Sequence, residues 1–406
     1  MSKLQTLIDK KNQASSYMMD EITKIIKTLP KRDPGSEGEK QTCEYMADVL
    51  KNDCGCEDVK IESFKENPGS FYGWIYITVT CMLISLVTFF FVPWISIVLI
   101  VFGLVLAVLQ FGLYLKFVDK LFPEKTGHNV TAVKHCTGET KRRIFFNGHV
   151  DAAWEWPVNY ALGGVGFESH AIIGFAGAFY YLVLSIIKVA TGGSDTLTKC
   201  ALWGIIFVPF WIGLYFMWNK KRVVDGANDN LSGCYMGITI LKMMKDEGID
   251  LENTEVGVII TGSEEAGLRG AYAWADAHKN DFNDVPTFII SYDTIHDPKQ
   301  LMVNYRNLNG TVKTDKDVGD MFYESAEQLG IFCKKGMVPP MGGATDDAAF
   351  AKAGLRATGI TGLNHKLENY YHTRRDTYDN MDEQGLADCF AVSVKALENF
   401  DNGAKQ

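Results

Sequence analysis

Two long stretches of this 406-residue chain contain no charged side chain, and they constrain the fold more than any other feature. Residues 71–92 and 94–115 each comprise 22 residues without Asp, Glu, Lys or Arg. At 1.5 Å per residue, each could form a helix of about 33 Å, long enough to cross the roughly 30 Å hydrocarbon core of a bilayer. A helix in a soluble core is seldom apolar on all sides over such a length. The sequence therefore predicts two membrane-spanning helices, separated at Pro93.

A second apolar block follows later in the chain. Residues 171–187 and 201–218 contain 17 and 18 residues without a charge, near the lower length limit of a membrane span. Aromatic residues that suit a membrane interface accompany the last stretch: Trp203, Trp211, Tyr215 and Trp218. The sequence therefore predicts a second pair of spanning helices, and a buried helix pair in a soluble core is the alternative.

The remaining sequence is typical of an α/β protein. Predicted helices cover residues 13–29, 39–50, 231–245, 267–278, 318–329 and 383–400. Predicted strands cover residues 59–64, 129–134, 143–146, 256–260 and 287–291. Alternating strands and helices favour a mixed, mostly parallel sheet with helices on both faces. We expect one discontinuous domain of residues 1–70, 119–157 and 223–406, with helical hairpins at residues 71–118 and 158–222.

Charge and cysteine content limit the classes of function. The formal net charge is -9, and no basic stripe is present, so a nucleic-acid partner is not expected. Nine scattered cysteines make a poor disulfide framework and are interpreted as reduced thiols, which suits a cytosolic location. Residues 1–18 are polar and lack the apolar core of a secretory signal peptide.

Five polar segments carry residues that could perform chemistry, and most follow an apolar strand. In an open α/β sheet, ligands bind at the carboxyl ends of strands. The residues of interest in these segments are His149 with Asp151, Asp229, Glu264 with Glu265, Asp293, and His372. Each has an ordinary explanation when taken singly: a hydrogen-bonded histidine, a helix N-cap or a solvated acidic turn. Together they supply two histidines and several carboxylates, a ligand set suited to zinc.

The five segments, in this order, resemble family 28 of the metallopeptidases, the two-zinc aminopeptidases. That group also includes the glutamate carboxypeptidase II and glutaminyl cyclase branches. The resemblance covers residues 21–64, 128–156 and 223–400, and residues 32–36 are similar to an early Arg and Gly-Ser signature of the family. Asp347 departs from the pattern, because the family often has Ser-Asp-His where this chain has residues 345–347.

The resemblance implies a role for each residue. Two Zn²⁺ ions would be held by five ligands: His149, Asp229, Glu265, Asp293 and His372. Asp229 would bridge both ions, and its bond to Asn230 would be a cis peptide. Asp151 would orient His149, and Glu264 would be the general base that activates a metal-bridged hydroxide. The implied function is a membrane-bound zinc aminopeptidase acting on peptides with a free N-terminus.

Two other functions stay open. A glutaminyl-cyclase-like acyltransferase with one zinc would share Asp229, Glu264, Glu265 and His372 with this chain. A membrane scaffold or transporter subunit with a relic peptidase domain is the second alternative, although the uncharged spans argue against a transport pathway. Amino-, carboxy- or dipeptidase specificity, side-chain preference and assembly as a homo-oligomer cannot be predicted from the sequence.

The distribution of positive charge predicts the orientation in the membrane. Positive residues near the domain ends of the spans are Lys65, Lys116, Lys120, Lys125, Lys220, Lys221 and Arg222, whereas the opposite ends have only Lys188 and Lys199. Since cytoplasmic flanks of spans are enriched in Lys and Arg, we expect a multi-pass protein of the cell membrane, with its catalytic domain facing the cytoplasm.

Overall fold

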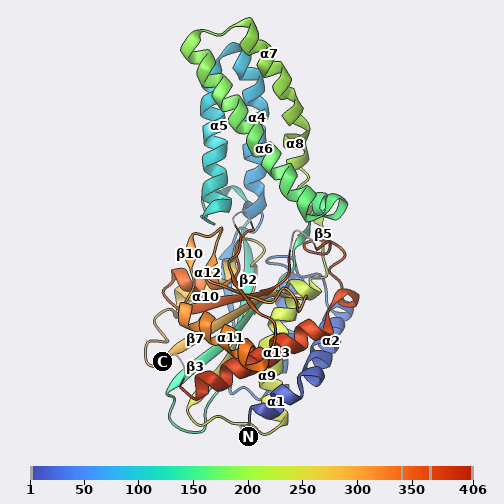
Figure 1. Ribbon diagram of the computed structural model, residues 1–406, viewed down its shortest axis with the longest axis vertical. Coiled ribbons are helices and arrows are strands. Elements are labelled where there is room, and N and C mark those ends of the chain that lie inside the picture. Colours follow the sequence, from blue (N-terminus) through green and yellow to red (C-terminus); the bar gives the residue numbers. More distant parts are fainter. Residues whose placement is uncertain (1–2, 340–341, 365–367, 404–406) are drawn as a thin grey trace.

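The molecule consists of an α/β domain and a long helical bundle that rises from one side of it (Figure 1). The computed structural model describes residues 3–339, 342–364 and 368–403. Both chain termini lie at the α/β domain, away from the bundle (Figure 1).

An eight-stranded sheet forms the centre of the α/β domain, in the order β1-β2-β6-β3-β7-β12-β8-β11. The strands are β1 (Asp58–Glu66), β2 (Lys125–Lys134), β3 (Arg142–His149), β6 (Thr254–Thr261), β7 (Thr287–Ile295), β8 (Met302–Asn304), β11 (Lys334–Gly336) and β12 (Arg356–Gly362). The middle pairs β6–β3, β3–β7 and β7–β12 are parallel, whereas β1–β2, β2–β6 and β12–β8 are antiparallel. The predicted mixed, mostly parallel sheet is therefore confirmed.

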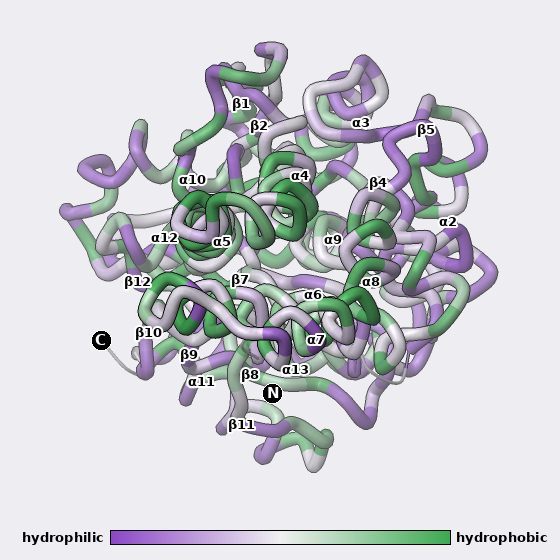
Figure 2. Tube along the Cα trace, turned by 90° about the horizontal axis from the view of Figure 1, so that it is seen from above, coloured by the Kyte–Doolittle hydropathy of each residue, from purple (hydrophilic) through white to green (hydrophobic). Residues whose placement is uncertain are grey.

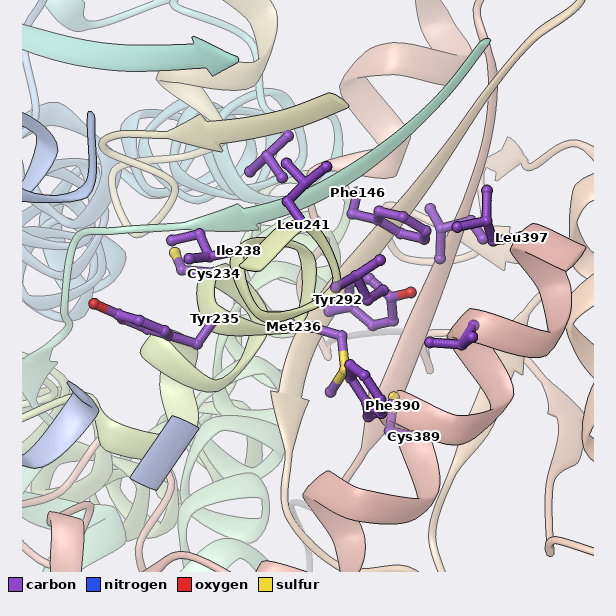
Figure 3. Packing of buried hydrophobic residues seen from close by; sticks show 14 of the residues in the cluster. Phe146, Cys234, Tyr235, Met236, Ile238, Leu241, Tyr292, Cys389, Phe390 and Leu397 are labelled. Atoms are coloured by element: carbon purple, nitrogen blue, oxygen red, sulfur yellow. The ribbon is translucent and has the colours of Figure 1, made fainter. Parts of the chain in front are cut away.

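Successive residues of the central strands face two different hydrophobic cores. Phe146 packs in the core that contains the helices α2, α9 and α13, whereas its neighbour Phe145 packs in the core that contains α10 and α12 (Figures 1 and 3). The helices of this domain are α1 (Gln5–Asp9), α2 (Lys11–Thr28), α3 (Glu37–Asp48), α9 (Ser232–Asp246), α10 (Arg269–His278), α11 (Lys316–Leu329), α12 (Asp347–Lys352) and α13 (Glu383–Asp401). Because side chains alternate along a strand, near-continuous apolar runs such as β6 bury both faces of the sheet.

The bundle contains four helices that are long and apolar enough to cross a membrane. The first hairpin is α4 (Ser70–Phe91) and α5 (Pro93–Ala107), which continues as the π-helical turn η2 (Val108–Gly112). The second is α6 (Pro157–Thr191), followed by α7 (Asp195–Trp203), the 3-10 turn η4 (Gly204–Phe207) and α8 (Val208–Leu214).

The second hairpin is longer than the uncharged stretches predicted. Helix α6 begins at Pro157 instead of residue 171, because a single charged residue, Glu168, does not interrupt a helix. Its first turns bend at Gly163, whose φ of 68° favours glycine. Helix α7 begins at Asp195 instead of residue 201, because the side chain of Ser194 accepts a hydrogen bond from the Leu197 amide and caps the helix.

The outer surface of the bundle is apolar. Of the large hydrophobic side chains that are exposed among the described residues, all but Ile61, Leu121, Phe332 and Met337 lie within residues 84–117 and 162–216. Seen along the bundle, the helices are predominantly hydrophobic, whereas the surrounding domain is largely hydrophilic (Figure 2). So many exposed apolar side chains on one set of helices suit a lipid environment.

Both hairpins leave the sheet at one edge. Strands β1 and β2 flank the first hairpin and pair with each other over nine positions, from Asp58 opposite Val133 to Glu66 opposite Lys125. A short antiparallel pair, β4 (Trp154–Glu155) and β5 (Asn219–Val223), flanks the second hairpin. The parallel strands β3, β6 and β7 end at the same edge, so the bundle stands over their carboxyl ends.

Candidate metal and catalytic site

The last residue of β3, His149, is buried at the carboxyl edge of the sheet. Its Nδ1 lies 3.2 Å from the backbone oxygen of Asp151 and 3.4 Å from the Asp151 carboxylate. These contacts leave Nε2 on the opposite side of the ring, turned toward Asp229. Asp151 therefore lies where a partner that orients His149 must lie.

The carboxylate of Asp229 lies between two histidines. Its Oδ1 is 3.3 Å from His149 Nε2, and its Oδ2 is 3.0 Å from His372 Nε2. Glu265 completes the group, with Oε1 3.1 Å from His372 Nε2. The bond between Asp229 and Asn230 is cis, as the resemblance predicts. A carboxylate with one oxygen toward each histidine has the placement that a bridging ligand requires.

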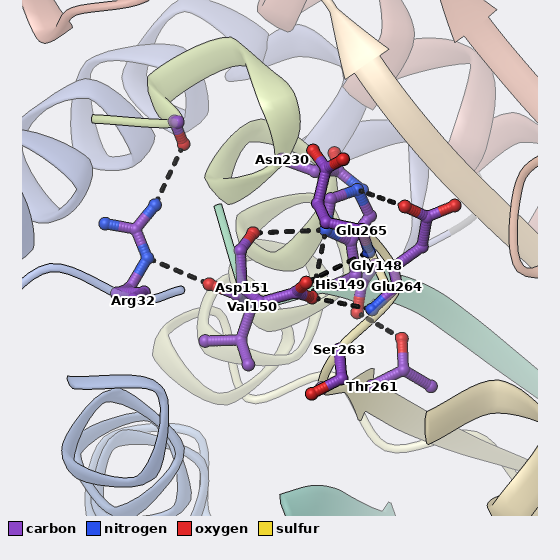
Figure 4. Close-up of polar contacts among 12 residues, drawn as sticks. Arg32, Gly148, His149, Val150, Asp151, Asn230, Thr261, Ser263, Glu264 and Glu265 are labelled. Carbon is purple, nitrogen blue, oxygen red and sulfur yellow. Dashed lines mark hydrogen bonds and ion pairs between the residues drawn. The ribbon is translucent and has the colours of Figure 1, made fainter. Parts of the chain in front are cut away.

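The turn that carries Glu264 and Glu265 directly follows β6 and is held by Asp151 (Figure 4). The Glu264 amide donates to Asp151 Oδ1 at 2.9 Å, and the Glu265 amide donates to Oδ2 at 3.0 Å. One buried carboxylate thus positions both glutamates as well as His149. Ser263 and His372 adopt left-handed backbone conformations, with φ of 55° and 52°, which are uncommon for non-glycine residues.

Arg32 fixes the position of β3 relative to the segment that carries Asp229. Its Nε donates to the Val150 oxygen at 2.8 Å, and Nη2 donates to the Asp225 and Gly226 oxygens at 2.7 and 3.1 Å (Figure 4). The guanidinium is buried and acts as a backbone clamp. This contact explains why an early arginine accompanies the later ligand segments in the sequence.

Asp376 is a site residue that the sequence analysis did not assign. Its Oδ1 accepts hydrogen bonds from the Asn228 backbone and side chain at 2.9 and 2.8 Å, and Oδ2 accepts from the Asp229 amide at 3.0 Å. Burial and the charge of Asp229 raise the pKa of Asp376 to about 7. The only sequence signal was its position four residues after His372, in the same polar segment.

Asp293 and Glu264 complete the acidic cluster. Asp293 lies within β7, and its Oδ1 accepts a hydrogen bond from Thr294 Oγ1 at 2.8 Å. Burial and the neighbouring charge of Asp229 raise the pKa of Asp293 to about 7. Burial also raises the pKa of Glu264 well above 4.5, and Glu264 Oε2 is 3.9 Å from His149 Nε2.

The two histidines interact favourably with the negative charge of these carboxylates. Burial alone would lower the pKa of His372, but the Glu265 and Asp229 carboxylates raise it to about 10. In return, the contacts with His149 and His372 outweigh burial and hold the pKa of Asp229 below its ordinary value. The site therefore attracts positive charge strongly.

The nitrogen and oxygen atoms of this cluster are arranged as ligands of a cation and not as hydrogen-bond partners of one another. His149 Nε2, Asp229 Oδ2 and Glu265 Oε1 are buried, and the short contacts given above do not form a hydrogen bond for any of them among the described residues. Donor atoms of these three residues all lie within 4.8 Å of one another. Imidazole nitrogen and carboxylate oxygen are ordinary zinc ligands, so this set fits a zinc ion and its surroundings.

Asp346 and Asp347 occupy the segment that departs from the family pattern. Asp346 is buried and accepts a hydrogen bond from Thr261, at the end of β6. Asp347 Oδ1 accepts from Asn307 Nδ2 at 2.7 Å and from Thr345 Oγ1 at 2.5 Å. Asp347 thus has a structural role at the start of α12.

The residues that lead into the second hairpin contact the His372 segment directly. The Trp156 amide donates to the His372 oxygen at 2.8 Å, and the two rings meet edge to face at 4.1 Å. Beside them, Glu155 forms a two-pronged ion pair with Arg374, at 2.6 and 2.8 Å. The last predicted ligand is therefore held by residues that begin the hairpin.

A cavity of about 220 Å³ opens beside these residues and continues between the helices of the bundle. At the α/β domain it is lined by Glu264, Glu265, Asp293 and His372. The site therefore faces the bundle and lies directly beneath it.

Comparison with known proteins identifies relatives of the α/β domain. Residues 214–397 match the model of peptidase family M28, which confirms the resemblance over this part of the chain. No curated protein matches the chain.

Solved structures share the fold at low sequence identity. A zinc aminopeptidase from Bacillus subtilis has a TM-score of 0.56 and 12% identity, and the match covers 95% of each chain. An aminopeptidase from Aneurinibacillus sp. strain AM-1 has a TM-score of 0.56 and 13% identity, with 96% of this chain and 95% of that chain covered. A glutaminyl cyclase from an Acidobacteriales bacterium also has a TM-score of 0.56 and 13% identity, with 97% and 95% covered. At these identities the likeness concerns the fold.

Proposed function

Residues 214–397 belong to peptidase family M28, and from this premise we propose that the protein is a membrane-bound, zinc-dependent aminopeptidase. The observation that carries the proposal is the buried Asp229 carboxylate, which has one oxygen at 3.3 Å from His149 and the other at 3.0 Å from His372. A relic domain has no need to keep such a set of charged groups buried together, since each costs desolvation free energy.

Two zinc ions per chain fit the ligand set. His149 and Asp293 would serve one ion and Glu265 and His372 the other, with Asp229 shared between them. When bound, two zinc ions polarise the scissile carbonyl and lower the pKa of a shared water toward neutrality. Asp151 would keep His149 Nε2 directed toward the metal by its contacts at Nδ1.

Glu264 would move the proton of the reaction. Its carboxylate takes a proton from the attacking water and returns it to the leaving amine. Hydrogen bonding of its amide to Asp151 fixes the turn, so that the side chain faces the cavity beside His149. The surrounding carboxylates of Asp229, Glu265 and Asp293 would bind the ammonium group of a free peptide N-terminus.

The proposed location is the cytoplasmic side of the cell membrane, with α4 to α8 in the bilayer. The seven-to-two division of Lys and Arg residues between the domain end and the far end of the bundle supports this orientation. Nine cysteines that are all unpaired support it as well.

A panel of peptides tests the activity. Purified protein loaded with zinc should hydrolyse peptides with a free N-terminus and leave their N-acetylated counterparts intact. A chelator should abolish hydrolysis, and added zinc should restore it. Equal cleavage of free and acetylated peptides would rule out an aminopeptidase, and the absence of cleavage in every zinc-loaded sample would rule out a peptidase.

The glutaminyl cyclase neighbour motivates a second candidate, an acyltransferase with one zinc. Its products differ from those of hydrolysis: a peptide with N-terminal glutamine would release ammonia and keep its length. The aminopeptidase releases free glutamine and shortens the peptide. Mass spectrometry of that single reaction, together with the number of zinc ions bound at saturation, decides between the two.

A further inference from the structure

We propose that the substrate is an amphiphile whose amide bond lies at the Asp229 centre and whose hydrocarbon part extends into the four-helix bundle. The inference rests on the proposed amide hydrolase function and adds the class of substrate. The chemistry is ordinary hydrolysis: one water is consumed, the acyl carbon gains its oxygen, and the C–N bond breaks. The amine leaves with the proton that Glu264 returns.

The cavity at the site is continuous with the interior of the bundle. At one end it is lined by Glu264 and His372, and at the other by Val79, Met82 and Ala178. Its wall combines residues of α4, α6 and α8 with residues of the sheet edge. A substrate that occupies the whole cavity therefore has one end at the metal ligands and the other among the membrane helices.

The depth of the cavity corresponds to one leaflet of a bilayer. Along α4 its lining runs from Phe71 to Met82, which is about 16 Å of helix at 1.5 Å per residue. Half of a roughly 30 Å hydrocarbon core is about 15 Å. The residues of α4 that line the cavity lie mainly in the half of the helix next to the α/β domain. The lining residue of α5 is Leu104, near the C-terminal end of that helix. The cavity thus reaches the depth of the acyl chains in the leaflet beside the domain.

The deep wall is suited to hydrocarbon and not to an extended peptide. Its side chains include Val79, Met82, Leu104, Phe175 and Ala178. Two polar side chains of this wall are hydrogen-bonded within the bundle. Thr78 Oγ1 donates to the Gly103 oxygen at 3.2 Å, and Trp211 Nε1 donates to the Gly174 oxygen at 2.8 Å. The backbone of a peptide would lose its hydrogen bonds there, at several kcal/mol per group, whereas a hydrocarbon chain has none to lose.

Polar recognition is available at the other end. Asn159 is buried in the cavity wall and donates to the Tyr371 oxygen at 2.6 Å through Nδ2. Its Oδ1 is buried without a hydrogen-bond partner among the described residues. This oxygen can accept a hydrogen bond from an amide N–H or an ammonium group beside the metal ligands. The cavity therefore has a polar end and an apolar end, which matches the two parts of the proposed substrate.

A chain-length series tests the inference on the full protein in lipid nanodiscs with zinc. The first arm uses alanine N-alkylamides with four to twelve carbons, which keep a free amine, and the second uses N-acylalanines of equal length. In one arm, kcat/KM should rise about fourfold per CH₂ group and level off when the cavity is full. The arm that responds identifies the side of the amide that carries the chain. If free-amine peptides are cleaved and chain length has no effect in either arm, the inference fails and the proposed function stands.

A crosslinking experiment gives a readout that does not depend on hydrolysis. A dodecylamine with a terminal diazirine should label Val79, Met82 or Ala178, with the labelled residue identified by fragmentation of the peptides in a mass spectrometer. Labelling confined to lipid-facing positions such as Phe179, which is 55% exposed, would overturn the inference even if peptides are hydrolysed.

A matched pair of variants on α6 separates the cavity from the lipid-facing surface. Ala178→Phe fills the deep end, because Ala178 is only 3% exposed and lines the cavity. The ratio of kcat/KM for the dodecyl amide to that for the butyl amide should fall at least tenfold. Ala176→Phe lies two residues away on the exposed side of the helix and should leave this ratio unchanged. Ala171→Leu narrows the cavity closer to the site and replaces Ala178→Phe if that variant does not fold. Equal ratios in all variants would contradict the inference.

Discussion

Arg269 and Asp119 form a buried, two-pronged ion pair, with Nη1 and Nη2 each 2.9 Å from a carboxylate oxygen. Ser70 Oγ adds a hydrogen bond of 2.7 Å to the same carboxylate. Arg269 begins α10 directly after the turn of Glu264 and Glu265, whereas Ser70 and Asp119 lie at the two ends of the first hairpin. The catalytic turn and the bundle are therefore joined by one charged cluster.

Removing one partner of this pair should be costly. Asp119→Ala leaves the guanidinium of Arg269 buried without its counter-charge, and the free energy of unfolding should fall by about 3–5 kcal/mol. Thermal unfolding of the purified protein measures the effect. Glu124→Ala is the matched control, because its ion pair with Lys65 is exposed on both sides and is worth about 0–1 kcal/mol. Equal effects of the two variants would show that the buried pair does not hold the hairpin.

The exchange of Glu264 for Gln should separate catalysis from metal binding. The amide keeps the shape of the side chain but cannot accept a proton, so kcat should fall on the order of 10²–10⁴-fold. The zinc content, measured by elemental analysis, should stay near that of the native protein. Glu265→Gln should instead lose zinc, because Glu265 is proposed as a ligand. Near-native turnover of the Glu264 variant would place the base elsewhere.

Asp376→Asn tests the residue that holds the Asp229 segment. The variant loses a charged acceptor for the amides of Asn228 and Asp229. Outer residues of metal sites typically contribute 10–100-fold to metal affinity, and we expect a loss of roughly that size for zinc. Zinc titration with a competing chelator measures it. Asp379→Asn, an exposed change three residues away, should bind zinc normally. Unaltered affinity in the Asp376 variant would mean that its hydrogen bonds are dispensable.

Labelling of single cysteines should establish the topology. Cys136, Cys200 and Cys333 are the cysteines that are not fully buried. Replacing these three removes the native thiols that a labelling reagent would reach. Thr196→Cys, in the exposed first turn of the fourth span, should react with an impermeant reagent in intact cells, whereas Thr28→Cys should react only after lysis. Both positions are exposed. The loop between the spans itself contains Gly192, whose left-handed backbone would be strained by a cysteine. The reverse pattern would place the α/β domain outside the cell. If Thr196→Cys is also unreactive in intact cells, the second hairpin does not reach the outer surface of the membrane.

A histidine far from the site predicts a pH dependence of stability. His135 Nδ1 is 2.7 Å from Glu255, and Nε2 is 3.0 Å from Asp58. The contact with Glu255 is the largest reason why the pKa of His135 is raised above its ordinary value. A raised pKa stabilises the fold below about pH 6.5 and ceases to do so as pH rises through the folded-state pKa.

The variant His135→Gln should therefore lower the unfolding temperature more at about pH 5.5 than at about pH 8.5. Lys141→Gln, which removes an exposed charge nearby, should show no such dependence. A larger effect of His135→Gln at the alkaline pH would contradict the sign of the shift.

The sequence pattern predicted the helices and strands that are recognisable from their own apolar residues. Strands β6 and β7 contain the short apolar runs at residues 256–260 and 288–290, and the uncharged stretches indicated the bundle. Strand β12 was missed, although it pairs with β7 in the middle of the sheet. Its residues, Arg356–Gly362, include two glycines and two threonines, so its place depends on neighbours and not on its own pattern. Strands β8 and β11 have only three residues each and carry no readable period.

Some residues of the site were likewise predictable from the sequence, and others were not. His149 and Glu264 follow strands that could be recognised, so their approach to one edge was predictable. The contact of Asp376 with Asn228 joins residues 148 positions apart, and Asp376 itself lies in a loop without regular structure. The cavity depends on where two hairpins stand above the sheet, and no local pattern encodes that. Sequence reasoning thus identified the groups that bear chemistry but not the enclosure around them.

The strand order also sets the sequence of events during synthesis. Strands β2 and β3 precede the second hairpin in the chain, yet β6, which lies between them in the sheet, is made only after that hairpin. Strands β7 and β12 come later still. A ribosome therefore delivers both apolar hairpins before the sheet can close. The proposed insertion of the bundle into a bilayer can thus begin while the domain below it is still incomplete.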